Sequence, residues 1–182
     1  IYSSPRAWWL FKTMGFENVT VLDGGLSTWK EHGFAIEKQH KKNTQIGDFK
    51  AEYQPNFIST SQEVLQKIHQ DKVTILDARS SGRFYGTAPE PRLEIRSGHI
   101  PNSVSMPYVE LLNGPQLKSK KDLQLIFNEL NPASKEMIFS CGSGITACVL
   151  ALAAEVVNYE KKTVYDGSWT EWGSLPNLPI EI

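Results

Sequence analysis

The sequence predicts an α/β protein built on a mainly parallel, doubly wound sheet. Short apolar runs of strand type recur from residue 73 onwards, and helix-compatible segments separate them. Short buried strands that alternate with helices form a parallel sheet covered on both faces. With 182 residues, 40% of them hydrophobic and 10% aromatic, the chain is long enough for one ordinary domain with some sequence left over.

The expected elements follow one another as strand, turn and helix. The expected strands are residues 73–77, 103–106, 137–140 and 163–165. The expected helices are residues 4–14, 61–70, 123–130 and 145–157. Ser61 is the expected N-cap of the second helix, because a serine hydroxyl accepts a hydrogen bond from the first helical turn. Function in such sheets collects at the carboxyl ends of the strands.

A glycine-punctuated loop that begins with a cysteine follows the third expected strand. The loop, Cys141-Gly-Ser-Gly-Ile-Thr146, leads directly into an apolar helical stretch. A helix N-terminus carries partial positive charge and unpaired N–H groups, which favour a thiolate and any anion beside it. Gly142 and Gly144 let backbone amides turn toward the sulfur as an anion nest. We therefore predict Cys141 to be a nucleophile; a buried structural thiol is the alternative.

Charge and cysteine content restrict the partners and the compartment. The net charge of −1 suggests neither nucleic acid nor an anionic membrane as a partner, and no apolar run approaches the about 20 residues that span a bilayer. Cys141 and Cys148 lie seven residues apart on one loop–helix segment, a geometry that disfavours a disulfide between them, and free thiols fit a reducing compartment. We expect a cytoplasmic location, or a mitochondrial one in a eukaryote. No His/Cys spacing predicts a metal, and no cofactor is expected.

An internal repeat relates the two ends of the chain. Val21–Trp29 aligns without a gap on Val164–Trp172, at an offset of 143 residues, and each copy follows a helical segment. Duplication explains this match better than chance does. Projected back by the same offset, Cys141 falls just before Ile1. We expect residues 1–37 to be the C-terminal remnant of an upstream repeat, 38–54 a polar linker, and 55–182 a complete catalytic domain.

Five motifs occur in order along the second part of the chain. They are Asp77-Ala-Arg79, Gly82–Arg92, Gly98-His-Ile-Pro101, Cys141–Thr146 and Tyr165–Trp172. Together they resemble the two-domain rhodanese sulfurtransferases, most of all those that use 3-mercaptopyruvate. Ser3–Trp9 and Leu22–Gly25 resemble the end of that family's catalytically silent first domain. The resemblance implies a rhodanese-like sheet in one complete C-terminal domain, preceded by the tail of a second rhodanese-like repeat.

The resemblance also implies a reaction and its residues. Sulfur moves from 3-mercaptopyruvate to a thiol acceptor such as thioredoxin or glutathione, or to cyanide, through a persulfide on Cys141. The loop that holds the persulfide is Gly142, Ser143, Gly144, Ile145 and Thr146, and Ser143 binds the donor's carbonyl or relays a proton. Arg83 and Arg92 match the two arginines that bind the substrate carboxylate, which a guanidinium fork holds bidentately.

Gly142 and Ser143 favour one sulfur donor over another. Thiosulfate-specific relatives carry two basic side chains after the cysteine, which suits a dianion. The two positions are neutral here and favour the monoanion mercaptopyruvate. A thiosulfate:cyanide sulfurtransferase is the alternative. A catalytically weak binding module is another, because part of the family's cleft belongs to the first domain.

Two further readings of the loop belong to other classes of protein. Gly142–Ala147 satisfies the G-x-G-x-x-A dinucleotide fingerprint, but it opens nearly the last strand–helix unit, whereas the fingerprint belongs to the first. Cysteine phosphatases need an arginine six residues after the nucleophile, and position 147 is alanine. Both readings are less favoured than sulfur transfer.

Several other conspicuous side chains are expected to be structural. Asp77 and Arg79 are predicted to pair with each other, and His99 to make a structural hydrogen bond in a turn. Cys148 is predicted to be a small core residue. The tryptophans are predicted to pack in the core or between domains; they are Trp8, Trp9, Trp29, Trp169 and Trp172.

Overall fold

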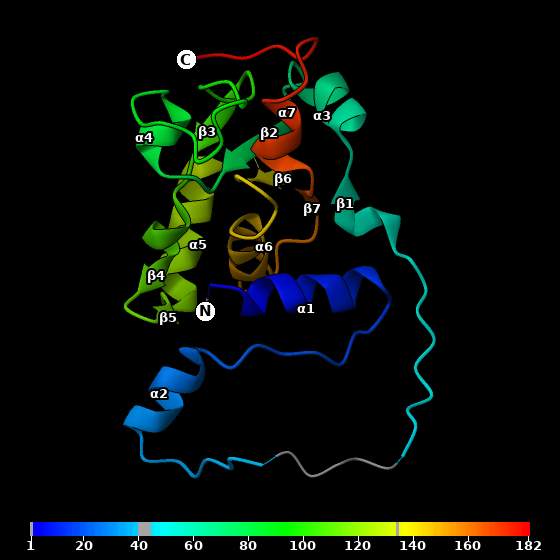
Figure 1. Ribbon diagram of the computed structural model, residues 1–182, viewed down its shortest axis with the longest axis vertical. Coiled ribbons are helices and arrows are strands. Elements are labelled where there is room, and N and C mark those ends of the chain that lie inside the picture. Colours follow the sequence, from blue (N-terminus) through cyan, green and yellow to red (C-terminus); the bar gives the residue numbers. More distant parts are fainter. Residues whose placement is uncertain (1, 40–44, 134) are drawn as a thin grey trace.

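The computed structural model describes residues 2–39, 45–133 and 135–182 (Figure 1). Its main sheet has five strands in the order β1-β7-β6-β2-β3, and every neighbouring pair is parallel. The strands are β1 Ile58–Ser59, β2 Val73–Asp77, β3 Ser103–Ser105, β6 Glu136–Ser140 and β7 Lys162–Tyr165. The predicted parallel α/β sheet is confirmed.

Helices and one small hairpin connect these strands. The α-helices are α1 Ser4–Thr13, α2 Gly25–Glu31, α3 Ser61–Lys67, α4 Ser81–Phe84, α5 Lys120–Leu130, α6 Ala147–Val156 and α7 Ser168–Trp172. Two 3₁₀ turns, η1 Pro55–Phe57 and η2 Tyr108–Leu111, and the hairpin β4 Leu112–Asn113 with β5 Gln116–Leu117 complete the described elements.

The sheet is covered on both faces, as a doubly wound fold requires. Alternate residues of β6 point to opposite faces: Phe139 packs with α1, α5 and α6, and Ile138 packs with α3 and α7. Phe127 of α5 and Trp172 of α7 are fully buried, one in each of the two apolar clusters. Helix α6 is apolar on nearly all sides because α1, α5 and the sheet surround it.

Some local details differ from the sequence prediction. Thr60, not Ser61, is the N-cap of α3: its hydroxyl accepts from the Glu63 N–H, while the Glu63 carboxylate accepts from the Thr60 N–H. Ser61 is the first helical residue and donates to Glu171. The strand β1 and the hairpin were not predicted, because two-residue strands show no measurable alternation.

The N-terminal segment packs against the rest of the molecule through α1. Figure 1 shows α1 lying across one end of α6, and α2 standing away from the sheet. The bounds of α1 and α6 differ by the same offset of 143 residues that relates the sequence repeat. Residues 19–22, which align with β7 at this offset, form no strand although all four are described.

The tryptophans and the linker follow the prediction only in part. Trp8, Trp9, Trp169 and Trp172 are buried, whereas Trp29 on α2 is 36% exposed and is not a core residue of this chain. Residues 45–53 are exposed, and residues 40–44 of the predicted linker lie outside the described part of the chain. The division into domains stays a prediction.

Candidate functional site

Cys141 lies at the carboxyl end of β6, directly before the loop that leads into α6, as predicted. Its side chain is only 1% exposed, so the thiol lies under the loop and not at the surface. The carbonyl of Cys141 accepts a hydrogen bond from the Trp169 N–H at 2.9 Å, which ties the loop to α7. Cys141 is thus buried, and its backbone is bound to α7.

The loop offers several unpaired backbone donors. In the described part of the chain, the N–H groups of Gly142, Ser143, Ile145 and Thr146 have no hydrogen-bond acceptor. Gly144 adopts a left-handed φ of 76°, which turns the chain sharply in the middle of the loop. Unpaired N–H groups in front of a helix N-terminus form a binding site for an anion.

Ser168 is a site residue that the sequence prediction missed. Its hydroxyl oxygen accepts hydrogen bonds from the N–H groups of Cys141 and Gly144, both at 3.1 Å. Its one proton has two acceptors, the Tyr165 carbonyl at 2.8 Å and the Cys141 sulfur at 3.9 Å. The side chain is fully buried, and its backbone has a φ of 51°. The Tyr165-Asp-Gly-Ser-Trp motif contained this signal, but no role was assigned to its serine.

Thr170 connects Arg92 to the loop and was also missed. The N–H and hydroxyl of Thr170 both donate to the Gly142 carbonyl, at 2.9 and 2.6 Å. Arg92 in turn donates from Nη1 to the Thr170 hydroxyl at 2.9 Å. Arg92 is exposed, and its Nη2 makes no hydrogen bond or ion pair among the described residues. A guanidinium edge at the rim of the loop is therefore available to an anion.

Arg83 is the last of four charged side chains that bind one another in a row, and the other three are buried. Asp77 binds Arg79, Arg79 binds Glu90 at 2.9 Å, and Glu90 binds Arg83 at 2.5 Å. Glu90 occupies the Nε–Nη2 edge of Arg83, whose Nη1 is left over. A Cβ added to Gly142 would lie 3.1 Å from Arg83 Nη2, so the guanidinium covers the start of the loop. The predicted pairing of Asp77 with Arg79 is confirmed.

A cavity of about 250 Å³ brings together four of the eight predicted site residues, namely Arg83, Arg92, Gly142 and Ser143. It is lined by Tyr2, Arg83, Glu90, Pro91, Arg92, Ile95, Gly142, Ser143 and Thr170. Ser143 is exposed at this cavity and makes no hydrogen bond among the described residues. Cys141 does not line it, because the loop covers the sulfur. The two arginines and the loop therefore converge, while the thiol lies behind them.

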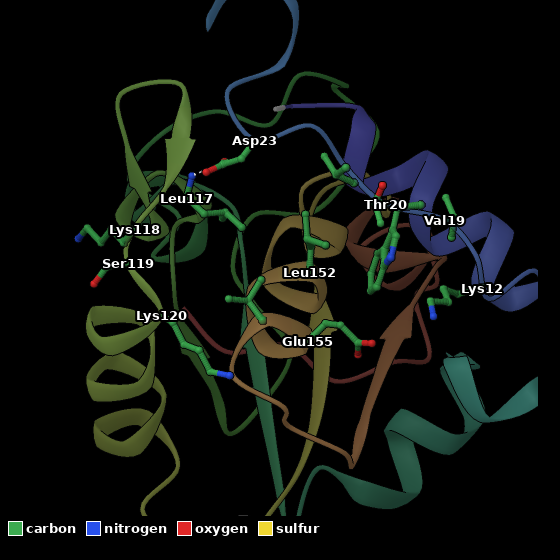
Figure 2. Close-up of a pocket in the computed structure, with 13 residues that line it drawn as sticks. Lys12, Val19, Thr20, Asp23, Leu117, Lys118, Ser119, Lys120, Leu152 and Glu155 are labelled. Carbon is green, nitrogen blue, oxygen red and sulfur yellow. Dashed lines mark hydrogen bonds between the residues drawn. The ribbon is translucent and has the colours of Figure 1, made fainter. Parts of the chain in front are cut away.

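A larger cavity, of about 560 Å³, lies elsewhere (Figure 2). Lys12, Val19 and Thr20 of the N-terminal segment face Leu152 and Glu155 of α6 across it, and Asp23 accepts a hydrogen bond from the Leu117 N–H. It shares no lining residue with the cavity at the loop. It belongs to the junction between the N-terminal segment and the sheet domain, not to the site.

His99 and Cys148, which were predicted to be structural, make structural contacts. His99 shares a hydrogen bond between Nδ1 and the Phe84 carbonyl at 3.0 Å, and its ring stacks on that of Phe84. Cys148 is fully buried on α6 and donates from its sulfur to the Gly144 carbonyl. No group of three or more His, Cys, Asp or Glu in the described ranges could hold a metal, and no described helix could span a membrane.

Comparison with known proteins identifies the family. Residues 60–175 match the model of the rhodanese-like domain, and this is more than half of the chain. The chain belongs to the rhodanese-like domain family. The predicted fold class and the resemblance to rhodanese sulfurtransferases are confirmed.

The similar proteins carry related names. The chain is 40% identical to the 3-mercaptopyruvate sulfurtransferase of Mus musculus over 174 residues, which cover 94% of the chain and 58% of that protein. It is 38% identical to thiosulfate/3-mercaptopyruvate sulfurtransferase 1 of Arabidopsis thaliana, over 100% of the chain and 54% of that protein. The crystal structure of the Escherichia coli 3-mercaptopyruvate sulfotransferase SseA matches with a TM-score of 0.79 and 35% identity, covering 92% of this chain and 63% of that one. The chain thus spans less than two thirds of these relatives.

The buried thiol of Cys148 predicts a loss of stability at alkaline pH. Burial raises its pKa from 9.0 to about 12, against the opposing effect of Arg6. Between pH 9 and 12 the unfolded chain loses this proton and the folded chain keeps it, so the free energy of unfolding falls as the pH rises. We expect Cys148 to cost about 1.4 kcal/mol of stability at pH 10 relative to pH 8.

Urea unfolding of the unmodified chain and of Cys148→Ala at pH 8 and pH 10 measures this effect. The contribution of Tyr165, whose pKa burial also raises, is common to both proteins and cancels. The stability difference between them is expected to shift by about 1.4 kcal/mol in favour of the variant at pH 10. An unchanged difference at the two pH values would contradict the prediction.

Proposed function

We propose that this chain carries the catalytic domain of a sulfurtransferase that moves sulfur from 3-mercaptopyruvate to a thiol acceptor or cyanide through a persulfide on Cys141. The observation that carries the proposal is a cysteine at the start of a loop with four unpaired amides in front of a helix. The names of the similar proteins support the reaction class. Thioredoxin or glutathione as acceptor, and a cytoplasmic location, belong to this proposal.

The proposed reaction is a double displacement. The Cys141 thiolate attacks the sulfur of 3-mercaptopyruvate, an S–S bond forms, and the C–S bond breaks. The electron pair leaves on carbon as the enolate of pyruvate, which then takes up a proton. A thiolate or cyanide acceptor next attacks the outer sulfur, and the S–S bond breaks to return the Cys141 thiolate. No external oxidant or reductant is required.

The residues of the loop and its rim divide this work. The Nη1 of Arg83 and the free edge of Arg92 bind the donor's carboxylate at the cavity. The unpaired amides and the Ser168 hydroxyl stabilise the sulfur anion before and after transfer. Ser143, exposed at the same cavity as the two arginines, is the side chain that binds the donor's carbonyl or relays its proton. Because the loop covers the thiol, the loop must move for the donor to reach the sulfur.

The first prediction concerns the intermediate. Incubation of the protein with 3-mercaptopyruvate, followed by intact-mass spectrometry without reductant, is expected to show a gain of one sulfur atom. Cys141→Ser is expected to show none, because the nucleophile is absent. Cys148→Ser, which keeps a hydrogen-bond donor at the other cysteine, is the matched control and should gain the sulfur. A gain of sulfur in Cys141→Ser would refute the proposal. So would the absence of a gain in a longer protein that includes the upstream repeat.

The second prediction concerns the choice of donor. We expect kcat/KM to be higher for 3-mercaptopyruvate than for thiosulfate, because the rim after Cys141 carries neutral Gly142 and Ser143. Ser143→Lys adds a cation at the cavity and should shift the ratio about fivefold toward the dianion thiosulfate. Asn128→Lys adds the same charge at an exposed position of α5 and should leave the ratio unchanged. Equal shifts of the kcat/KM ratio in the two variants would contradict the interpretation that the residues after Cys141 set the choice of donor.

We further propose that residues 1–37 are the end of an upstream rhodanese-like repeat, as the 143-residue offset suggests. Apolar side chains exposed in this segment match buried ones in the second copy. Leu22 is 55% exposed where Tyr165 is fully buried, and Leu26 is 57% exposed where Trp169 is 1% exposed. The exposed side chains therefore lack the sheet that covers their counterparts, which supports an upstream repeat as their partner.

This proposal predicts a change in hydrogen exchange. The amides of residues 19–22, which form no strand here, are expected to exchange rapidly in this chain. In a longer protein that includes the upstream repeat, they should pair with a strand and be protected, as in β7. The amides of β7 itself serve as the internal control and should be protected in both proteins. Rapid exchange of residues 19–22 in the longer protein would rule out the repeat.

A further inference from the structure

The carbonyl of Gly144, in the middle of the Cys141 loop, accepts two hydrogen bonds from side chains outside the loop. It accepts one hydrogen bond from the Cys148 sulfur at 3.1 Å and another from Arg6 Nη1 at 3.3 Å. The N–H of the same residue donates to the Ser168 hydroxyl at 3.1 Å. Both polar groups of Gly144 are therefore fixed, and one of the partners comes from α1, far away in the sequence.

Arg6 is itself anchored by two further contacts. Its guanidinium forms an ion pair with the carboxylate of Asp166, the residue that follows β7. Its central carbon lies 4.8 Å from the centre of a Trp9 ring, in a cation–π contact. Burial opposes its charge, but the hydrogen bond and attraction from Asp166 prevail and raise the pKa of Arg6. The cation is therefore permanent and has little freedom to move.

Gly144 is fitted closely to this anchor. With its φ of 76°, an added Cβ would lie 2.5 Å from the Asp166 carboxylate oxygen and 3.0 Å from Arg6 Nη1. No side chain fits in that space without moving the ion pair. The side chains of Arg6 and Asp166 thus pack directly against the backbone of Gly144, with no other side chain between them.

A fixed Gly144 carbonyl also fixes the amide that follows it. The peptide bond between Gly144 and Ile145 is trans and planar, so its C=O and its N–H point in opposite directions. Because the carbonyl points toward Arg6 and Cys148, the Ile145 N–H points away from them. This N–H is one of the four amides that have no acceptor in the described part of the chain. Arg6 thereby sets the direction of an anion-binding donor.

We propose that Arg6 is a positioning residue for the Cys141 loop, supplied by a helix outside residues 60–175 that match the rhodanese-like domain. It acts through the Gly144 carbonyl and does not touch the donor. What the loop stabilises, a thiolate and then a persulfide, rests on the proposed function. With Arg6 in place the Ile145 N–H is aimed at the anion, and without it the Gly144 carbonyl keeps only the hydrogen bond from the Cys148 sulfur, so the peptide is held less firmly.

The test compares Arg6→Gln and Arg6→Lys with Lys12→Gln, a control on the same helix that removes a charge away from the loop. The probe is the rate of Cys141 alkylation by iodoacetamide as a function of pH, measured in the Cys148→Ser background of every variant. Arg6→Gln is expected to raise the pH of half-maximal reactivity and to slow alkylation at pH 7 about tenfold. Arg6→Lys should restore part of the rate, and Lys12→Gln should match the parent.

Steady-state kinetics gives a second measurement. For Arg6→Gln, kcat with 3-mercaptopyruvate should fall about tenfold while KM changes little, because Arg83 and Arg92 still bind the carboxylate. The titratable groups around the loop other than Arg6, namely Asp166, Glu90, Arg83 and Arg92, are the same in the two Arg6 variants and the control, so the comparison isolates Arg6.

Two results would overturn the proposal. One is an Arg6→Gln alkylation profile that coincides with that of Lys12→Gln. The other is a fall in the melting temperature with no change in the pH profile, since this would assign Arg6 to stability alone. The alkylation test needs no sulfur donor, so it still decides the role of Arg6 if no variant forms a persulfide and the proposed function fails.

Discussion

Asp77 and Arg79 form a buried ion pair at the carboxyl end of β2, and the surrounding loops are arranged on it. Both side chains are 1% exposed. Besides Asp77, Arg79 binds Glu90 and the Gly98 carbonyl, and its guanidinium lies 4.5 Å from the centre of a Trp169 ring. One cation thus joins the segment that carries Arg83 and Arg92 to α7, whose Trp169 N–H donates to the Cys141 carbonyl. Loss of one partner in such a buried pair costs about 3–5 kcal/mol.

Most of the sheet could be predicted from the sequence, because buried strands and helices leave strong patterns. The strand at 73–77 has the predicted bounds, and the strand before Cys141 begins one residue earlier than predicted, at Glu136. The local pairing of Asp77 with Arg79 could be predicted from their spacing. The role of Glu90 could not, since it lies in a proline-rich stretch whose path depends on tertiary contacts.

The site could be predicted in part for the same reason. Cys141 and its loop precede an apolar helix and are adjacent in sequence, so local rules suffice to recognise them. Ser168 and Thr170 reach the loop from α7, 24 to 28 residues farther along the chain. Their contacts depend on the parallel pairing of β6 with β7, which no local pattern encodes. The predicted cap was Ser61 and the observed cap is Thr60. The prediction was wrong by one position because serine and threonine both form N-caps.

The pairing of α1 with α6 has a consequence for the origin of the molecule. Under the proposed duplication, the two helices are copies of one element, so two copies of the same helix pack against each other in one chain. A one-repeat ancestor could have formed a dimer through this helix before fusion. Fusion frees the two copies to diverge: Arg6 occupies the position that corresponds to buried Val149 on the other helix. Under the proposed duplication, the two copies of the helix now differ, and one of them carries the charge that we propose orients the loop of the other.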